Sequence, residues 1–549
     1  MRQKMLFVLS LMMLVVGSAF SQTKVVRGTV TDSATNNPLP GVSVTIPGNS
    51  SGTATNDEGK FSLTVPSTTR TITLSLVDYG SVVADVTGND ELQIKMRSGN
   101  RSMDEVVVIG YGTQKKKDLT GAVSTIGSRD VAGRQTIQVS EALQGAVSGV
   151  SVTRTSGAPG STGSILIRGI TTLGTNSPLI ILDGVPVSNI DNVNPNDVES
   201  ITVLKDAASA AIYGSRGAAG VILISTKRAK DGQSSFEYNF EYGWQKPTAL
   251  PEYASAPEYM RYFNEQQTND GATTGSYPQA FIDNFADSNR LNPDKFPFGN
   301  TNWQKTIMTK DYAPRVRHDL VFTMGTGKVK TKASVGYSSA DAFYVNNSYE
   351  RYLVRVNNDL QINNKLSANF DIAYKRTEIE TPVVNPIREA RVMPSIYDDF
   401  YNDGRYALAK DGRNPIAELN EGGTVKSAFN QIQGRLVFRY KPIKDLVLTA
   451  LFSPTFDFDQ TKSFSKRLTF TNPDGSASSF SNRPRTILNE IRNENLVLTG
   501  QFFADYNKQF NGGHSLGILG GYEEIYNKFD SLTASRSGFA LNDFPYLNS

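Results

Sequence analysis

Alternation of apolar and polar residues marks the chain from about residue 229 onward. In the first such stretch every even position from 236 to 244 is aromatic, and Glu237, Asn239 and Glu241 lie between them. The same period recurs at 329–337, 352–356, 366–374, 432–440, 446–452, 496–506 and 516–522. A period of two places alternate side chains on opposite faces of a strand. We therefore predict about nine or ten long antiparallel strands, each with one apolar face.

Such strands fit two kinds of sheet. A soluble antiparallel sheet with one solvated face alternates in this way, and so does a transmembrane β-barrel, whose strands of about ten residues carry aromatics near their ends. Residues 1–21 favour the barrel, because Arg2 and Lys4 precede an apolar run and Ala19-Phe20-Ser21 resembles a cleavage site. The run is shorter than the roughly 20 residues of a membrane-anchor helix. We therefore predict a signal peptide at 1–21 and, at 245–315 and 378–428, long polar extracellular loops.

A different pattern occupies residues 118–228. Short aliphatic runs bounded by turn residues predict buried strands at 165–167, 179–182, 201–204 and 221–224. Asp183-Gly184 between two of these runs is a hairpin signal. Residues 139–144 suit a short helix with Ser140 as its cap, and residues 206–213 suit a second one that ends at Gly214. The region is predicted to be a compact α/β domain with a central sheet of about four strands.

Residues 22–97 predict a small β-sandwich. Val42, Val44 and Ile46 alternate on one face of a strand, as do Phe61, Leu63 and Val65. Turns at 38–41 and 56–59 separate these strands, and short strands with regular turns are typical of a sandwich.

Composition excludes several kinds of function. The 549 residues carry a net charge of +3 and give no support for nucleic-acid binding. Cysteine is absent, which excludes disulfides, thiolate metal sites and cysteine nucleophiles. With two histidines in the chain and no recognisable catalytic constellation, we predict no enzyme activity, no catalytic residues, no metal site and no cofactor. The Ser463-to-Lys466 spacing matches a serine-lysine motif by chance, because its companion motifs are missing.

Several motifs in the α/β region occur together and in order. They include Ile167-Arg168-Gly169, Leu182-Asp183-Gly184-Val185-Pro186, Asn194 to Ser200, Val203 to Ala207 and Ala211 to Ile222. In this combination the region resembles the plug domain of TonB-dependent outer-membrane transporters of the SusC/RagA type. Residues 22–97 resemble the carboxypeptidase-regulatory-like domain that many such transporters carry. The resemblance singles out as plug-motif residues Arg168, Gly169, Asp183, Gly184, Glu199, Lys205, Asp206, Tyr213, Gly214, Arg216 and Gly217.

The role of the plug charges is open from sequence. Inside a barrel they can pair with a polar wall, and otherwise they are solvated surface charges. The sequence does not identify their partners. Gly214, Gly217 and Gly220 are predicted to allow a tight backbone path, since their order and spacing fit no nucleotide-binding loop.

Residues 98–117 link the two amino-terminal domains. An extended, mostly β-branched segment resembles the TonB box of this family and comprises Asp104, Glu105, Val106, Val107, Val108 and Ile109. Such a segment can add as an edge strand to a partner sheet. The alternative is an ordinary strand of the plug.

The resemblance implies an active importer in the outer membrane of a Gram-negative bacterium. Its implied partners are TonB with its inner-membrane energy-coupling proteins, a SusD-like surface lipoprotein, outer-membrane lipid and a glycan or peptide substrate. The glycine-rich loop at 157–160 would lie near that substrate. The alternative function is a sensor or adhesin anchored by a barrel.

The predicted fold is mainly β, with a small β-sandwich, an α/β plug and an incomplete antiparallel transmembrane β-barrel. The predicted order is signal peptide 1–21, β-sandwich 22–97, TonB-box-like linker 98–117, plug 118–228 and barrel strands 229–549. A barrel that encloses a plug needs about 22 strands, so we expect the sequence to be an amino-terminal part of a longer protein.

Overall fold

The computed structural model describes residues 23–547, except 34, 48–51, 77–78, 88–90, 98–105, 110–111, 116–122, 155, 293, 479–480 and 511–513. The chain divides into two compact units, and the division falls in the linker around residues 107–119. The predicted signal peptide, Asp104 and Glu105 lie outside the described residues. No helix in the described part is long and apolar enough to cross a membrane.

The amino-terminal unit is a sandwich of two β-sheets. One sheet has the order β4-β1-β7 and the other β3-β2-β5-β6. Their inward residues, among them Val30, Phe61 and Leu74, form a buried apolar core, as the alternation predicted. The strands are β1 (Thr23–Asp32), β2 (Ser43–Thr45), β3 (Gly52–Ala54), β4 (Lys60–Pro66), β5 (Thr71–Ser75), β6 (Val82–Asp85) and β7 (Glu91–Met96).

The linker contains two short strands that pair with each other. They are β8 (Val106–Ile109), which is the described part of the TonB-box-like segment, and β9 (Gly112–Lys115). The extended conformation expected for 106–109 is therefore present in the backbone.

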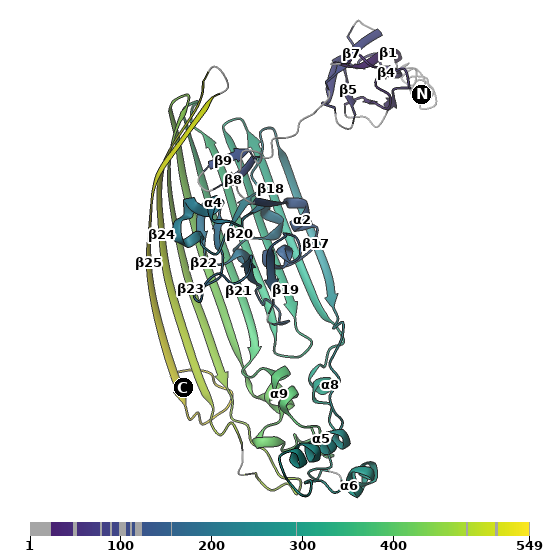
Figure 1. Ribbon diagram of the computed structural model, residues 1–549, viewed down its shortest axis with the longest axis vertical. Helices are drawn as coiled ribbons and strands as arrows, with labels where there is room; N and C mark the ends of the chain where they lie inside the picture. The colour runs from purple at the N-terminus through teal and green to yellow at the C-terminus, as the bar shows by residue number, and fades with distance from the viewer. Residues whose placement is uncertain are drawn as a thin grey trace, which may run out of the picture. The chain divides into compact units, whose positions relative to one another are not determined.

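The plug has a central sheet of five strands in the order β10-β15-β16-β13-β14. Figure 1 shows it with its short helices in front of the large sheet. β13 and β16 pair in parallel at Leu182 and Ile224, and β13 turns back into β14 through Asp183-Gly184. The strands are β10 (Val123–Gly127), β13 (Leu179–Leu182), β14 (Val185–Val187), β15 (Val198–Leu204) and β16 (Val221–Thr226).

One predicted strand belongs to a different sheet. β12 (Ser164–Ile167), which contains the run at 165–167, pairs with β11 (Val150–Thr153) in a separate two-stranded sheet. Ile165 and Ile167 still enter the apolar core that the central sheet forms with α2 (Ser128–Ala132). The aliphatic run predicted its burial, and burial does not identify the neighbouring strand.

The two predicted plug helices differ from expectation in detail. α3 (Val139–Leu143) starts after Gln138, and Ser140 lies inside the helix rather than at its cap. The second prediction was one helix at 206–213, but α4 (Ala207–Ala210) continues as a 3₁₀ helix, η4 (Ala211–Gly217). Asp206 caps α4 by accepting from the Ser209 amide at 3.1 Å. The short 3₁₀ helices η2 (Ile190–Asn192) and η3 (Pro195–Asp197) connect β14 to β15.

Nine antiparallel strands in sequence order form the large sheet, as the period of two predicted. Aromatic and aliphatic residues cover one face, and Phe236, Tyr238 and Trp244 are each more than half exposed there. The sheet is open, with β17 and β25 at its edges. The strands are β17 (Ser234–Gln245), β18 (Ala313–Thr326), β19 (Val329–Asp341), β20 (Ser348–Gln361), β21 (Leu366–Pro382), β22 (Gly423–Ile443), β23 (Leu446–Ser465), β24 (Ile487–Gln509) and β25 (Ser515–Ser537).

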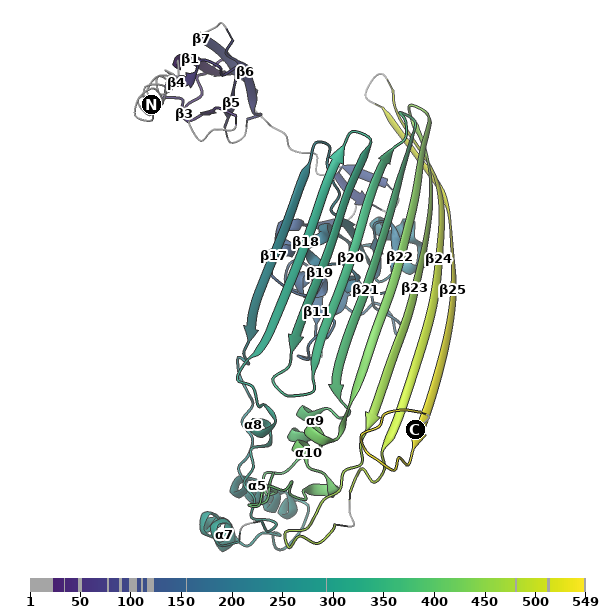
Figure 2. The same cartoon turned by 180° about the vertical axis from the view of Figure 1, so that it is seen from behind.

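The connections at the two ends of this sheet differ in length. Short turns join the strands at one end. At the other end three of the four connections are long segments, and Figure 2 shows several helices there. The long segments were predicted as polar loops, and the structure adds compact helical structure with its own apolar clusters. The helices are α5 (Ala256–Asn269), α6 (Gln279–Asp283), α7 (Phe285–Leu291), α8 (Trp303–Ile307), α9 (Pro386–Val392), η5 (Lys410–Gly412) and α10 (Pro415–Glu421).

Candidate functional site

The candidate site is the contact between the plug and the polar face of the large sheet, here called the wall. Its centre is the two-residue turn between β13 and β14. Asp183 and Gly184 both have positive φ, 49° and 89°, which is the conformation of a tight type I′ hairpin. The turn directs the Asp183 carboxylate back to β16, where it accepts from the Thr226 amide at 2.9 Å and the Thr226 hydroxyl at 2.8 Å.

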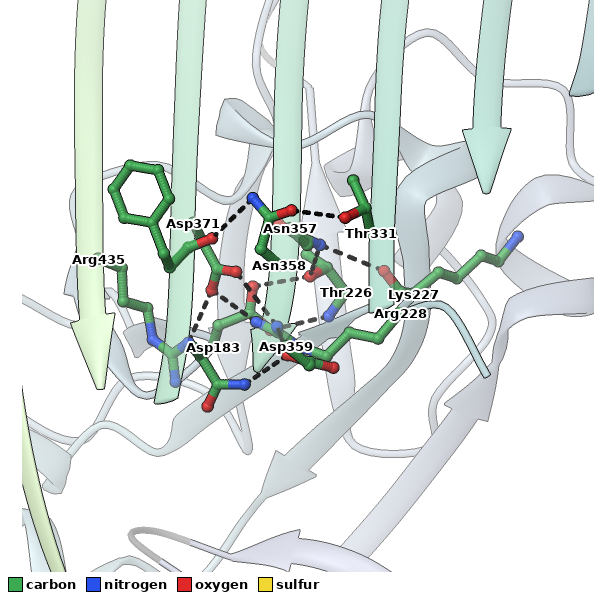
Figure 3. Close-up of polar contacts among 12 residues, drawn as sticks. Asp183, Thr226, Lys227, Arg228, Thr331, Asn357, Asn358, Asp359, Asp371 and Arg435 are labelled. Carbon is green, nitrogen blue, oxygen red and sulfur yellow. Dashed lines mark hydrogen bonds and ion pairs between the residues drawn. The ribbon is translucent and has the colours of Figure 1, made fainter. Parts of the chain in front are cut away.

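Arg228 follows β16 and makes the most extensive contact with the wall (Figure 3). Its guanidinium donates to both carboxylate oxygens of Asp371, at 3.1 and 2.6 Å, and also to Asp359. Asp371 accepts in addition from Arg435 at 2.7 Å. Two parallel donors give an arginine-carboxylate pair both strength and a fixed orientation. The end of the plug domain is thereby fixed to β20, β21 and β22.

Burial and charge act in opposite directions at this cluster. Burial alone would raise the pKa of Asp183, but the nearby charges of Arg435, Arg228 and Arg355 lower it below its ordinary value. Burial alone would lower the pKa of Arg228, but its bonds and proximity to Asp371 raise it. Both groups therefore stay ionised at neutral pH, and the contact depends on paired charges.

A second contact lies at the start of β15. Asp197 forms an ion pair with Lys332 of β19 and accepts from the Ser334 hydroxyl at 2.6 Å. Asn196 donates to Asp319 of β18 at 2.7 Å. These residues belong to the stretch 194–200 that carried part of the family resemblance.

A third contact involves the plug backbone. Arg315 and Arg317 of β18 donate to the carbonyls of Gln135 and Thr136, and Arg351 of β20 donates to those of Ile137 and Asp191. The Asp191 carboxylate is occupied inside the plug, where it accepts from the Ser140 amide and hydroxyl, both at 2.8 Å. Burial raises the pKa of Asp191, although these bonds act against it.

The remaining predicted plug charges have mixed roles. Arg216 forms an ion pair with Glu523 of β25. Arg168 and Asp206 approach each other within the plug at 4.0 Å. Lys205 donates to the hydroxyls of Ser124 at 2.6 Å and Ser148 at 3.2 Å.

Glu199 is solvent-exposed at the edge of a cavity of about 770 Å³ between the plug and β17–β19. Paired and solvated charges are thus both present among the residues singled out by sequence.

The predicted glycines allow the local backbone conformation, and Tyr213 contributes to packing within the plug. Gly214 has φ 59° and ψ −146°, a conformation that essentially only glycine adopts. A Cβ at Gly217 would lie 3.0 Å from the Ala210 carbonyl oxygen. Gly169 also has positive φ, and Tyr213 packs in the apolar cluster beneath β16. The structure agrees with the predicted tight backbone path.

Most of the wall residues that contact the plug, and Arg228 of the plug, were not predicted from the sequence. Arg351, Arg355 and Asp359 recur at spacings of four on β20, on the face opposite Tyr352 and Val354. Charges on the inward face of a predicted barrel strand are the signal that could have found them. Arg228 had no such signal, because it follows the last plug strand in an irregular segment.

Comparison with known proteins agrees with this architecture. The family profile for the TonB-dependent Receptor Plug Domain matches residues 115–221, and that for the CarboxypepD_reg-like domain matches 26–108. TonB-dependent receptor P26 of Formosa agariphila is 32% identical over 91% of this chain and 48% of its own length. TonB-dependent receptor SusC of Bacteroides thetaiotaomicron is 32% identical over 63% of this chain and 34% of its own. The chain is related to the SusC/RagA-type TonB-dependent receptors.

Solved structures of such receptors share its fold. The RagAB peptide importer in its "open-open" state superposes with a TM-score of 0.66 at 24% identity, over 81% of this chain and 51% of the other. At this identity the likeness concerns the fold. The chain spans about half the length of P26 and of TonB-dependent receptor P3 of Formosa agariphila, to which it is 28% identical.

Proposed function

We propose that this chain belongs to an outer-membrane importer in which the plug closes a barrel and TonB displaces it. The observation that carries this proposal is the plug-to-wall contact. A domain with a TonB-dependent receptor plug profile is held by paired charges on the polar face of a sheet whose opposite face is apolar. An adhesin anchored by a barrel would not need a plug held in this way.

The proposed partners follow from the relatives. TonB with its inner-membrane complex supplies energy through the segment at 106–109, and a SusD-like lipoprotein covers the outer side. The substrate is a glycan, as the family resemblance implies, or a peptide, since a peptide importer is among the similar structures. Its place of action is the outer membrane of a Gram-negative bacterium.

Replacing Val107 by proline tests the coupling. Proline removes a backbone donor and fixes φ, so it weakens pairing of this strand with a partner strand. We expect uptake of labelled oligosaccharides or peptides to fall to the level of cells without the gene. Surface abundance should stay unchanged, because the linker is remote in sequence from the wall strands.

Val107→Thr is the matched control, because threonine keeps the backbone donor and favours strand conformation. It should import at the wild-type rate. Full uptake in the proline variant, measured at equal surface abundance, would exclude the proposed role of this segment.

A further inference from the structure

The first described part of the plug is residues 123–134, which comprise β10 and α2, and we call it the leading segment. β10 is an edge strand of the central sheet and pairs with β15 alone. Ile126 and Val131 are the only two of its twelve residues that are buried. Few buried apolar side chains therefore hold the leading segment to the rest of the plug.

The leading segment has no polar attachment to the wall among the described residues. Its side chains form no ion pair there, and their hydrogen bonds go to the plug, for example from Lys205 to Ser124 at 2.6 Å. Ala132 and Gly133 line the cavity of about 770 Å³ between the plug and β17–β19. A cavity rather than packed side chains thus lies between this end of the segment and the wall.

The next three residues of the plug are bound by three arginines of the wall, here called the arginine clamp. The carbonyl oxygens of residues 135–137 accept from Arg315, Arg317 and Arg351 in that order, and the bond from Arg317 is 2.8 Å long. Arg317 and Arg351 are only 4% and 3% exposed. Charged donors form stronger hydrogen bonds than neutral ones. Because the acceptors are main-chain carbonyls, the clamp fixes the backbone itself at three consecutive residues.

Beyond the clamp, side chains of the plug are attached to the wall as well. Ile137 packs in an apolar cluster with Ala340 and Tyr349 of the wall. The ion pairs that Asp197 and Arg228 form with the wall follow later in the chain. The attachment of the plug to the wall thus changes in kind at residue 135.

We infer that the leading segment opens as a separate unit and that the arginine clamp stops this opening at Gln135. Regions with few buried apolar contacts open at a lower free energy than the rest of a domain. The leading segment also comes next in the chain after the linker, so a pull on residues 106–109 reaches it first. The inference deepens the proposed import function and rests on it, because it names the part of the plug that TonB would withdraw.

Withdrawal of the whole plug is the alternative, and it costs more free energy. It would break the ion pairs that Asp197 and Arg228 form with the wall, and a buried charge that loses its partner is strongly destabilising. Withdrawal of the leading segment alone keeps these pairs. It also joins the space vacated by α2 to the neighbouring cavity, which enlarges a path between the plug and β17–β19.

Thiol labelling of the purified full-length protein in detergent tests the inference. The 549 residues contain no cysteine, so one reporter at a time can be introduced. Val131→Cys lies in the leading segment, whereas Val139→Cys and Val203→Cys lie beyond the clamp, and all three valines are 0% exposed. We expect dithionitrobenzoate to label Val131→Cys at least about tenfold faster than the other two, because a buried thiol reacts only when its surroundings open.

Variants of the clamp test where the opening stops. Arg317→Ala and Arg351→Ala should each speed the labelling of Val139→Cys about tenfold, as loss of a charged donor does, and leave that of Val203→Cys unchanged. Slow labelling of Val203→Cys also shows that the remaining plug is folded. Arg492→Ala is the matched control, because Arg492 lies on β24 with its side chain 60% exposed, and it should change no rate.

Three results would overturn the inference. The first is labelling of Val131→Cys no faster than that of the other two reporters, which would mean that the plug opens as one body. The others are clamp variants that leave Val139→Cys protected, or that expose Val203→Cys together with it. Labelling needs neither TonB nor substrate, so it is independent of uptake by the Val107→Pro variant. Full uptake in that variant would exclude the coupling and leave the labelling result standing.

Discussion

Single side chains decide how the plug is held, and Arg228 is the clearest case. It bridges Asp359 and Asp371, and Asp371 also meets Arg435. The main destabilising effect of replacing Arg228 would come from the carboxylates that lose it as a partner. Removal would leave Asp359 without an ion-pair partner among the described residues and Asp371 with Arg435 alone, and loss of a partner from a buried charge is costly even where the intact pair contributes little net stability.

Replacing Arg228 by alanine should therefore destabilise the plug-to-wall contact, by less than the about 3 to 5 kcal/mol of a buried charge left with no partner, because Asp371 keeps Arg435. We expect a lower apparent melting temperature and faster proteolysis of the plug in the purified protein. Lys230→Ala is the control, because Lys230 is exposed, and it should match the wild type. A melting temperature that is equal in both variants would contradict the role assigned to Arg228.

At the scale of elements, the long connections are folded structures with their own electrostatics. Asp398 lies in the segment between β21 and β22, where burial and the charges of Asp294 and Asp399 raise its pKa to about 6. A raised pKa means that the folded state binds the proton more tightly than the unfolded state. Stability from this group is present at low pH and falls as the pH rises toward 6.

Asp398→Asn removes this pH dependence. We expect the variant to melt higher than the wild type at pH 7.5, and the difference to shrink as the pH falls from 6 to 4. Scanning calorimetry across this range measures it. Asp287→Asn, at a highly exposed carboxylate in α7, is the control. A constant difference at every pH would show that charge on Asp398 is not the cause.

At the scale of the whole molecule, the amino-terminal sandwich has a core of its own. Val26, Val44, Phe61 and Leu74 are buried in one cluster whose members all lie between residues 26 and 96. A domain with a separate core is expected to fold alone. The predicted boundary at residue 97 can therefore be tested directly.

Residues 22–97 produced alone should unfold cooperatively in urea. Phe61→Ala should lower the free energy of unfolding by about 3 to 5 kcal/mol, because it empties a large buried site. Val83→Ala changes a side chain that is 64% exposed and should have little effect. A gradual, non-cooperative transition of the wild-type fragment would disprove the proposed boundary.

Sequence periodicity determined the elements because it reports local burial. The period of two located eight of the nine wall strands and missed β18, and the short aliphatic runs predicted β13 and β16. Asp183-Gly184 predicted a tight hairpin, since few residue pairs tolerate two consecutive positive φ angles. These signals need only neighbouring residues, and so a single sequence carries them.

Only the tertiary structure decided which charged residues of the plug and the wall form pairs. Arg228 and Asp371 are 143 residues apart, and Asp197 and Lys332 are 135 apart. No local pattern links them. The same limit explains why β12 joined β11 instead of the central sheet, and why Ser140 donates to Asp191 instead of capping its helix. The sequence thus determined which residues form strands and which of their faces are polar, and only the packing of plug on wall selected the partner of each charge.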